Sequence, residues 1–515
     1  MNRYTCEARN GARPKSTNIC KCDLRLSVAL ICLLLANAAS AVPHKAAALS
    51  QSIAPPSTSH NTQLYPAYQP EQYRPSIWRV VDSPIIQPGT LNAVAAISAD
   101  DVWAVGYDDT IFSSSPLSVK SLILHRDRGR WSTVRSPNPG VLNEIRGIAA
   151  VAKNDVWAVG VYYELTEERQ QALILHWDGT LWSQIESPSL GSNAAGLDDV
   201  VAISANDIWA VGAYGMADGK QSFALLEHWD GTQWTIFPSP NPGSRVNGLD
   251  GVSAVSPDDV WAVGTYADYQ EDGGFGAFKT LAMHWDGSKW EVVHSPNGEG
   301  YSHAYELRDV TAIARDDVWA VGSYLPDIGA NVPYQMLTLH WDGSEWKVIP
   351  NAFSTQSTML AGVTATSARD VWAVGNYCPA ECDNRSGHSP MTMHWDGDRW
   401  NAEPIDVVSS DSYLSGVAVV PGVTGAEVWV VGDLKTVVDF RVQVLIAHSA
   451  PEEAAPPVVA SPPAPTSEPS GNSAPGMPRT GAGMDIITLY LALLSLLGML
   501  LLLVGVSLQG RDSHM

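Results

Sequence analysis

The feature that most constrains this chain is a tryptophan pattern that recurs seven times along the sequence. In each repeat, one tryptophan lies in the segment Asp-Val-Trp-Ala-Val-Gly or a close variant of it: Trp103, Trp157, Trp209, Trp261, Trp319, Trp372 and Trp429. Successive members of this set are 52 to 58 residues apart. A fixed period of this length predicts a repeat architecture, and it makes these tryptophans structural residues first.

Residues 196–239 show what a single repeat builds. Four short apolar runs, at 197–203, 207–212, 223–229 and 234–237, are rich in β-branched and aromatic residues. Ser204-Ala205-Asn206 and Asp230-Gly231 separate them as tight turns, and Pro238 ends the last run. The repeat has no helical periodicity. Four antiparallel strands per unit predict the blade of a β-propeller.

The two ends of the repeat region predict how the ring closes. The segment from Trp78 to Pro84 matches the fourth strand of a repeat, whereas the last repeat has only three strands and ends near His448. The N-terminal strand therefore supplies the missing strand of the last blade, which leaves no open sheet edge there. We predict an all-β fold, a seven-bladed β-propeller over residues 77–449 that is closed by its N-terminal strand.

The N-terminal region is typical of a secretory signal. Residues 1–41 combine a positively charged start with the apolar stretch 26–36 and the small residues Ala39-Ser40-Ala41 before a cleavage point. A membrane anchor is the alternative, but this apolar stretch is too short to cross a bilayer core of roughly 30 Å. We expect a cleaved signal peptide, followed by a linker at residues 42–76.

The C-terminal region predicts an anchor. Residues 450–483 form a Pro-rich stalk, 485–508 are an apolar run long enough for a transmembrane helix, and 509–515 are a short tail. The segment Met477-Pro478-Arg479-Thr480-Gly481 resembles the LPxTG sorting signal of bacterial surface proteins, with Met in the first position. That resemblance implies that a sortase cleaves after Thr480; a plain transmembrane anchor is the alternative. Both place the propeller outside the cell, on the plasma membrane or cell wall.

Charge and cysteine content narrow the partners. The formal net charge is −23, so nucleic acid, which needs a basic surface, is not an expected partner. Beyond the signal segment the chain keeps only Cys378 and Cys382, and an oxidising compartment favours a disulfide between them. A zinc site is not expected there because no further ligand lies nearby in sequence.

Each repeat also carries one histidine at the end of its third strand and one carboxylate at the start of its second. The histidines are His125, His176, His228, His284, His340, His394 and His448. Equivalent positions in neighbouring blades lie about 10 Å apart or more, too far to share a metal ion. We expect a hydrogen-bonding role for the histidines, and carboxylates such as Asp207 that accept backbone N–H groups of the adjacent turn.

The connections between strands indicate where a ligand would bind. Turns between strands one and two, and between three and four, are short, whereas the other two sets are long and varied and lie on one face of the ring. Loops on a rigid scaffold commonly carry function. The candidate ligand-binding residues on this face are Asp268, Tyr269, Glu271, Asp272, Tyr301, His303, Tyr305 and Glu306. Their side chains could hold a sugar or, through carboxylate oxygens, Ca²⁺; the alternative is a solvated acidic loop.

The repeat region as a whole resembles secreted bacterial propellers of the kelch-like and WD-like kind, and its His-Trp-Asp-Gly-x-x-Trp turn resembles the Asp-box of sialidase-like propellers. The resemblance implies a fold and no particular activity. We expect a surface-anchored protein that binds a polysaccharide, glycoprotein or protein partner and is not an enzyme, with no cofactor and no metal other than Ca²⁺. The alternative is a glycan-active enzyme, which needs paired carboxylates about 5 to 9 Å apart.

Overall fold

The chain was analysed as a computed structural model. It describes residues 77–82, 84, 88–108, 118–166, 168–191, 194–216, 220–270, 276–297, 304–326, 333–351, 357–378, 387–407, 409, 411–422, 427–436 and 442–450. The predicted signal peptide, linker, stalk, sorting motif, transmembrane helix and tail lie outside these residues and stay predictions. In the part of the chain that the structure covers, no helix has the length and hydropathy needed to cross a membrane.

Twenty-eight strands and no helix make up the described fold. They are β1 (Ile77–Val80), β2 (Gly89–Ser98), β3 (Asp101–Asp108), β4 (Lys120–Asp127), β5 (Arg130–Thr133), β6 (Leu142–Ala152), β7 (Asp155–Glu164), β8 (Arg169–Trp177), β9 (Trp182–Ile185), β10 (Ala194–Ser204), β11 (Asp207–Gly215), β12 (Ser222–Trp229), β13 (Trp234–Ile236), β14 (Val246–Ser256), β15 (Asp259–Ala267), β16 (Lys279–Trp285), β17 (Trp290–Val292), β18 (Ala304–Ala314), β19 (Asp317–Leu325), β20 (Gln335–Trp341), β21 (Trp346–Val348), β22 (Thr358–Ser367), β23 (Asp370–Tyr377), β24 (Ser389–Trp395), β25 (Trp400–Glu403), β26 (Asp411–Val419), β27 (Val428–Lys435) and β28 (Val442–Ala450).

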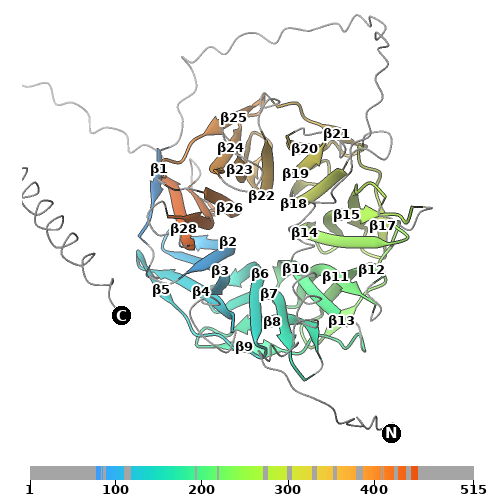
Figure 1. Ribbon diagram of the computed structural model, residues 1–515, viewed down its shortest axis with the longest axis horizontal. Helices are drawn as coiled ribbons and strands as arrows, with labels where there is room; N and C mark the ends of the chain where they lie inside the picture. Colours follow the sequence, from blue (N-terminus) through green and yellow to red (C-terminus); the bar gives the residue numbers. More distant parts are fainter. Residues whose placement is uncertain are drawn as a thin grey trace, which may run out of the picture. The chain divides into compact units, whose positions relative to one another are not determined.

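These strands form seven four-stranded antiparallel sheets, which are the blades of a closed ring (Figure 1). Blade 1 is β2–β5, and the blades follow in chain order to blade 7, whose sheet has the order β1-β28-β27-β26. β1 pairs with β28, with Trp78 opposite Ser449. The predicted seven-bladed propeller and its closure by the N-terminal strand are therefore confirmed.

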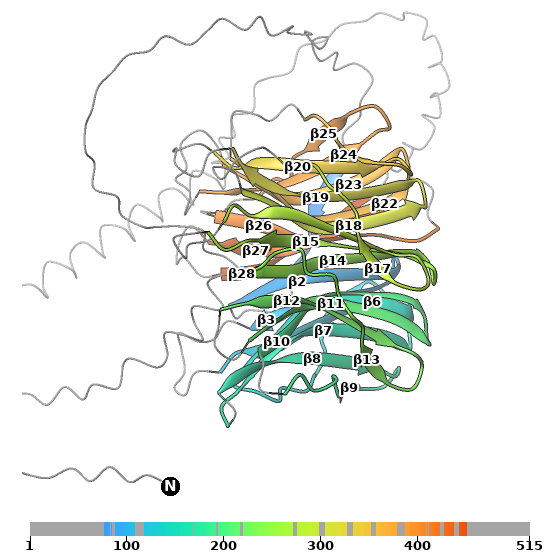
Figure 2. The same cartoon turned by 90° about the vertical axis from the view of Figure 1, so that its right-hand side faces the viewer.

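The first strand of each blade lies innermost, where it contacts the first strands of both neighbouring blades. Figure 2 shows the sheets from the side, stacked one against the next around the ring. The inner strands are long, such as the 11 residues of β10, whereas outer strands such as β13 have 3. The inner strand of every blade also has a register shift after its first buried leucine or isoleucine, as between Leu197 and Asp199 in blade 3. This irregularity turns the following side chain toward neighbouring inner strands.

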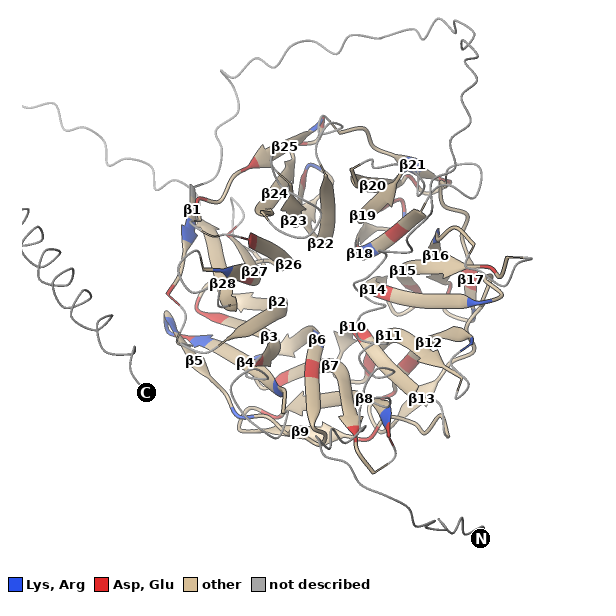
Figure 3. Ribbon diagram, in the orientation of Figure 1, with Lys and Arg blue, Asp and Glu red and all other residues tan. Residues whose placement is uncertain are grey.

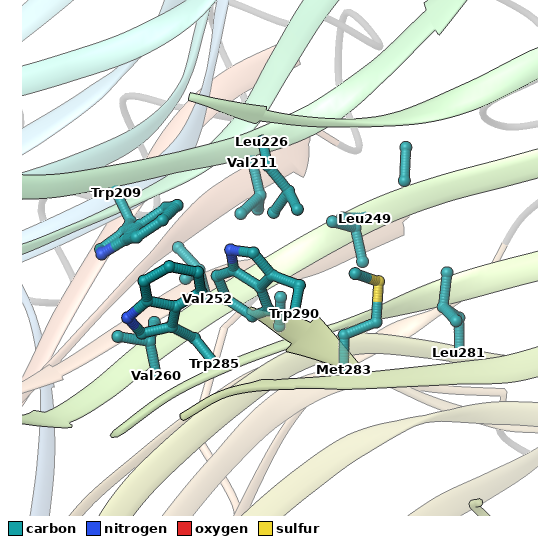
Figure 4. Packing of buried hydrophobic residues seen from close by; sticks show 12 residues of the cluster. Trp209, Val211, Leu226, Leu249, Val252, Val260, Leu281, Met283, Trp285 and Trp290 are labelled. Carbon is teal, nitrogen blue, oxygen red and sulfur yellow. The ribbon is translucent and has the colours of Figure 1, made fainter. Parts of the chain in front are cut away.

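The tryptophans fill the interfaces between blades. Trp209 of β11 is 1% exposed and packs against Trp285 and Trp290 of blade 4, with ring centroids 5.1 Å and 5.2 Å away (Figure 4). The same contact recurs around the ring, for example where Trp103 of blade 1 meets Trp182 of blade 2. A blade therefore cannot bury its aromatic face alone, because the partner rings belong to the next blade.

The repeated histidines and carboxylates bond to each other. His228 Nε2 lies 2.8 Å from Asp207 Oδ1, and five other blades have the same pair at the same distance. The histidine ring also packs on the tryptophan of the second strand, at 4.4 Å for Trp209 and His228. The predicted hydrogen-bonding role of the histidines is confirmed in these six blades. The expectation that the aspartates accept turn N–H groups was wrong, because the bonds described for their Oδ1 atoms go to the imidazole and, in three blades, to the indole N–H of the second-strand tryptophan.

Blade 7 departs from the other six. Its inner hairpin connection runs from Val420 to Glu427, so the expectation of short turns between all first and second strands was wrong for this blade. There the carboxylate is Glu427, whose Oε1 lies 3.8 Å from Nδ1 of His448. In this blade the carboxylate faces Nδ1 of the histidine, whereas in the other six it bonds to Nε2.

Candidate functional site

Six charged side chains gather on the innermost strands of blades 2 to 5. Each stands immediately before or after the buried leucine or isoleucine of its inner strand, and we call them the axial cluster: Glu144 and Arg146 on β6, Asp198 on β10, Asp250 on β14, and Glu306 and Arg308 on β18. Figure 3 shows charged residues on these four strands around the ring axis. Positions equivalent to Arg146 carry Asn92, Ala361 and Ser415 in blades 1, 6 and 7, so charge at this position is confined to blades 2 to 5.

Two guanidinium groups join the carboxylates in a nearly symmetric arrangement. Arg146 reaches Glu144 of its own strand at 3.1 Å and Asp198 of blade 3 at 2.8 Å. Arg308 likewise reaches Glu306 of its own strand at 3.0 Å and Asp250 of blade 4 at 3.4 Å. Asp198 and Asp250 therefore stand side by side on adjacent blades, with one arginine beyond each.

Electrostatic interactions also run between blades that are not adjacent. Arg308 of blade 5 acts on Asp198 of blade 3, and Arg146 of blade 2 acts on Asp250 of blade 4. Only side chains that extend from the inner strands toward the ring axis can interact past an intervening blade. Their side chains are 20% to 36% exposed, so this polar group is accessible to water.

The two central carboxylates have raised pKa values. Burial raises the pKa of Asp250 to about 7, although Arg308 opposes the shift; the charge of Asp198 adds to it. Burial also raises the pKa of Asp198, while Arg146 favours its ionised form. For Arg308 the charge of Glu306 raises the pKa against the effect of burial. At neutral pH the cluster thus holds two fixed cations and a carboxyl that is partly protonated.

Two further aspartates connect the inner strands that carry this site. Asp199 Oδ2 accepts the backbone N–H of Val252 in the next blade at 2.9 Å, and Asp309 Oδ2 accepts that of Val363 at 2.7 Å. Burial raises the pKa of both carboxyl groups, to about 7 for Asp309. Because both bond to backbone groups of the following blade, they fix the spacing of the inner strands and with it the positions of the axial side chains.

The structure separates the residues that the sequence analysis grouped on the long-loop face. Glu306 belongs to the axial cluster, and Tyr305 instead packs in the blade-5 core, stacked on Tyr324 at 5.2 Å. Asp268 and Tyr269 lie close together near Ser244, at the blade-4 rim. Glu271, Asp272, Tyr301 and His303 lie outside the described residues. The four described members of the predicted group therefore do not form a single common site.

The rim group has its own bonds. Asp268 accepts the backbone N–H of Ser244 at 3.0 Å, which is the main cause of its lowered pKa, and its other oxygen lies 3.6 Å from Lys279. Tyr269 is 41% exposed, donates to the carbonyl of Lys220 at 2.8 Å and has the guanidinium of Arg245 over its ring at 5.1 Å. These contacts make it an ordered aromatic surface patch and supply no group suited to proton transfer.

The surface depressions of the structure lie away from the axial cluster. Two depressions of about 370 Å³ and 290 Å³ share Phe237, Pro238 and Ser239 at the outer side of blades 3 and 4, and no axial side chain lines them. No group of three or more metal-ligand side chains occurs among the residues that the structure describes. Cys378 is disulfide-bonded, whereas Cys382, its expected partner, lies outside the described part.

The sequence analysis missed Glu144, Arg146, Asp198, Asp250 and Arg308. A signal was available in the repeat alignment, because Glu-Ile-Arg at 144–146 and Glu-Leu-Arg at 306–308 occupy positions that are neutral in three other blades. Charged residues at a repeat position that is neutral elsewhere depart from the structural pattern and therefore indicate function. The sequence analysis looked for a binding site in the long loops and therefore did not consider these strands.

A seven-bladed β-propeller with a charged axial cluster is thus the class that fold and site define. No protein-family model matches the chain, and a search of curated proteins found no match. Among solved structures, YCF48 bound to D1 peptide is 14% identical with a TM-score of 0.44, covering 75% of this chain and 98% of its own. The GH74 xyloglucanase from Xanthomonas campestris is 12% identical with a TM-score of 0.43 and coverage of 72% and 55%. A PL25 ulvan lyase has 12% identity, a TM-score of 0.43 and coverage of 71% and 95%.

The expectation that this protein is not an enzyme is corrected by the same comparison. Besides the xyloglucanase and the lyase, the similar structures include an arabinanase, an arabinofuranosidase and a sialidase. The likeness is one of fold.

Proposed function

We propose that this protein is a glycan-active propeller, which binds a polysaccharide at the axial cluster and donates a proton to it from Asp250. The observation that carries this proposal is the arrangement of Asp198 and Asp250 on neighbouring inner strands, each held by an arginine, at 2.8 Å and 3.4 Å. The raised pKa of Asp250, about 7, is consistent with it. A general acid works best when its pKa lies near the working pH.

The donor and acceptor pattern of the cluster suits sugar hydroxyls. A hydroxyl both donates and accepts, and the cluster alternates carboxylates, which accept, with guanidinium groups, which donate. The alternation extends from Glu144 on blade 2 to Glu306 on blade 5. A ligand that runs across these blades would make several such contacts. A chain of sugars suits this arrangement better than a compact metabolite does.

Asp198 and Asp250 are the two carboxylates that we propose as the catalytic pair. Asp198 and Asp250 stand on neighbouring blades, and the charge on Asp198 helps to keep the proton on Asp250. Two carboxyl groups with different protonation states can act as acid and base on a glycosidic bond. The arginine beyond each carboxylate keeps it in place and limits how far its pKa can rise.

The test is a polysaccharide screen with the soluble protein, residues 42–450, using xyloglucan, arabinan, polygalacturonate and alginate. We expect new chain ends from at least one of them at pH 6 to 7, and at least a 100-fold loss in Asp250→Asn. Asp398→Asn is the matched control, because Asp398 is exposed in a turn on the opposite face of the ring. Binding without cleavage by the wild-type protein would overturn the proposal.

The location outside the cell remains part of the proposal. A cleaved signal peptide at 1–41 and an anchor near 477–508 would display the propeller outside the cell, where polysaccharides are available. Mass spectrometry of the mature N-terminus and of the residue at Thr480 tests both predictions.

A further inference from the structure

A second group of titratable side chains lies on the other side of the ring axis. His388, just before β24 in blade 6, and Asp411 and Tyr413 of β26 in blade 7 form a compact hydrogen-bonded group. His388 Nδ1 lies 3.1 Å from Asp411 Oδ1 and 2.8 Å from the Tyr413 hydroxyl, whose oxygen also lies 3.2 Å from Asp411 Oδ2. No structural pattern of the repeats accounts for this group, because the other blades have no equivalent of it among the described residues.

The three side chains differ in their access to water. His388 and Asp411 are buried, with side chains 5% and 9% exposed, whereas Tyr413 is half-buried. Tyr413 precedes Leu414 on its inner strand, as Glu144 precedes Ile145 and Glu306 precedes Leu307. The phenol therefore stands at the same level of the ring as the two axial glutamates, and the imidazole and the carboxylate lie behind it.

The seven-fold arrangement fixes which strands lie across the axis from β26. In a ring of seven blades, blade 7 lies opposite the junction of blades 3 and 4, where Asp198 and Asp250 stand; Figure 1 shows β26 across the axis from β10 and β14. A ligand bound at the axis would then have the proton donor Asp250 on one side and the phenol of Tyr413 on the other.

We propose that Tyr413, His388 and Asp411 form a proton relay that accepts a proton from a water or hydroxyl group bound at the ring axis. The proton of that group passes to the oxygen of Tyr413 while the phenolic proton passes to Nδ1 of His388. One O–H bond breaks as one forms on Tyr413, and the phenolic O–H bond is replaced by an N–H bond. The imidazolium is stabilised by the carboxylate of Asp411. Tyr413 is the catalytic residue, and the other two are positioning residues.

The electrostatics of the group are consistent with a relay. Burial, together with the charge of Asp411, raises the pKa of Tyr413 above its usual range, so the phenol stays neutral instead of ionising. A neutral phenol can act as a base only if its own proton leaves at the same time, and His388 provides the acceptor. For this transfer Nδ1 of His388 is unprotonated and accepts the phenolic hydrogen, and the proton that arrives on Nδ1 is then within hydrogen-bond distance of Asp411 Oδ1.

This inference rests on the proposed function for its reaction, so the first test uses a probe that needs no polysaccharide. N-acetylimidazole acetylates tyrosine hydroxyls as the phenolic proton is lost, and peptide mass spectrometry locates the acetyl groups. We expect Tyr413 in the wild-type protein to react at least 10-fold faster than in His388→Gln. Tyr269, which donates to a backbone carbonyl, is the internal control and should react equally in both proteins.

The second test measures polysaccharide cleavage. We expect Tyr413→Phe to lower kcat at least 100-fold with little change in KM, and His388→Gln to lower kcat in the same way. Tyr214→Phe is the control, because Tyr214 of β11 stacks on Phe223 and belongs to neither proposed group. Acetylation that depends on His388 without cleavage by the wild type would uphold the relay and refute the proposed function. Acetylation of Tyr413 at equal rates in wild type and His388→Gln would overturn the relay whatever the activity.

Discussion

Replacing Trp209 by alanine tests the claim that contacts between blades hold the ring together. The side chain is 1% exposed, and its ring centroid lies 4.9, 5.1 and 5.2 Å from those of Phe237, Trp285 and Trp290. A buried tryptophan removes roughly 150 to 250 Å² from water, and at about 25 cal/mol per Å² this stabilises the fold by about 4 to 6 kcal/mol. Alanine retains part of this burial, so we expect a loss of about 3 to 5 kcal/mol.

No hydrogen bond is lost with this side chain, because the indole N–H of Trp209 has no partner among the described residues. The loss therefore measures packing alone. For a domain of this size the entropy of unfolding is roughly 0.8 kcal/mol per kelvin, so the expected fall in Tm is about 4 to 6 °C. Calorimetry of the soluble protein measures it, and circular dichroism verifies that the variant folds.

Trp209→Phe is the graded control. Phenylalanine keeps an aromatic ring against Trp285 and should lose less than half as much stability. If Trp209→Ala melts at the wild-type temperature, the blades do not depend on this contact, and our placing of the ring's stability in the blade interfaces is wrong.

Other substitutions test the site and the fold. Glu227 is fully buried, one of its oxygens has no partner among the described residues, and burial raises its pKa to about 7. The folded protein keeps this proton between pH 4.5, the pKa in the unfolded state, and about pH 7. The stability linked to this proton is therefore fully present below pH 4.5, and the free energy of unfolding falls by about 3 kcal/mol as the pH rises to 7. Glu227→Leu should raise Tm at pH 8 and flatten this pH dependence. Arg308→Ala leaves Asp250 without its counterion and should cost about 1 to 3 kcal/mol at pH 8 and less at pH 5, measured by denaturant unfolding. Gly212→Ala would place a Cβ only 2.1 Å from the carbonyl oxygen of Gly196, so poor expression or a Tm several degrees lower is expected; a Tm equal to wild type would show that the strands can separate there.

The sequence by itself determined the blade and the ring. Strand pairing within a blade joins neighbouring segments, so turns such as Asp230-Gly231, with φ of +92° at the glycine, can be recognised locally. The count of tryptophans gave the number of blades, and the fourth-strand character of the Trp78 segment gave the closure that β1 and β28 make. These features repeat along the chain, so each repeat supports the structure predicted for the others.

The site depended on tertiary structure. Glu144 and Arg308 are 164 residues apart in the sequence, and the closed ring alone brings both to one side of the axis. Sequence analysis placed Glu306 in a binding site together with Tyr305, but adjacent residues of a strand point to opposite sides, and one entered the core while the other reached the axis. Protonation followed the same rule, because the pKa of Asp250 reflects burial and charges from three other blades. Local order is written in consecutive residues, whereas burial and electrostatics depend on distances that exist only after the ring has closed.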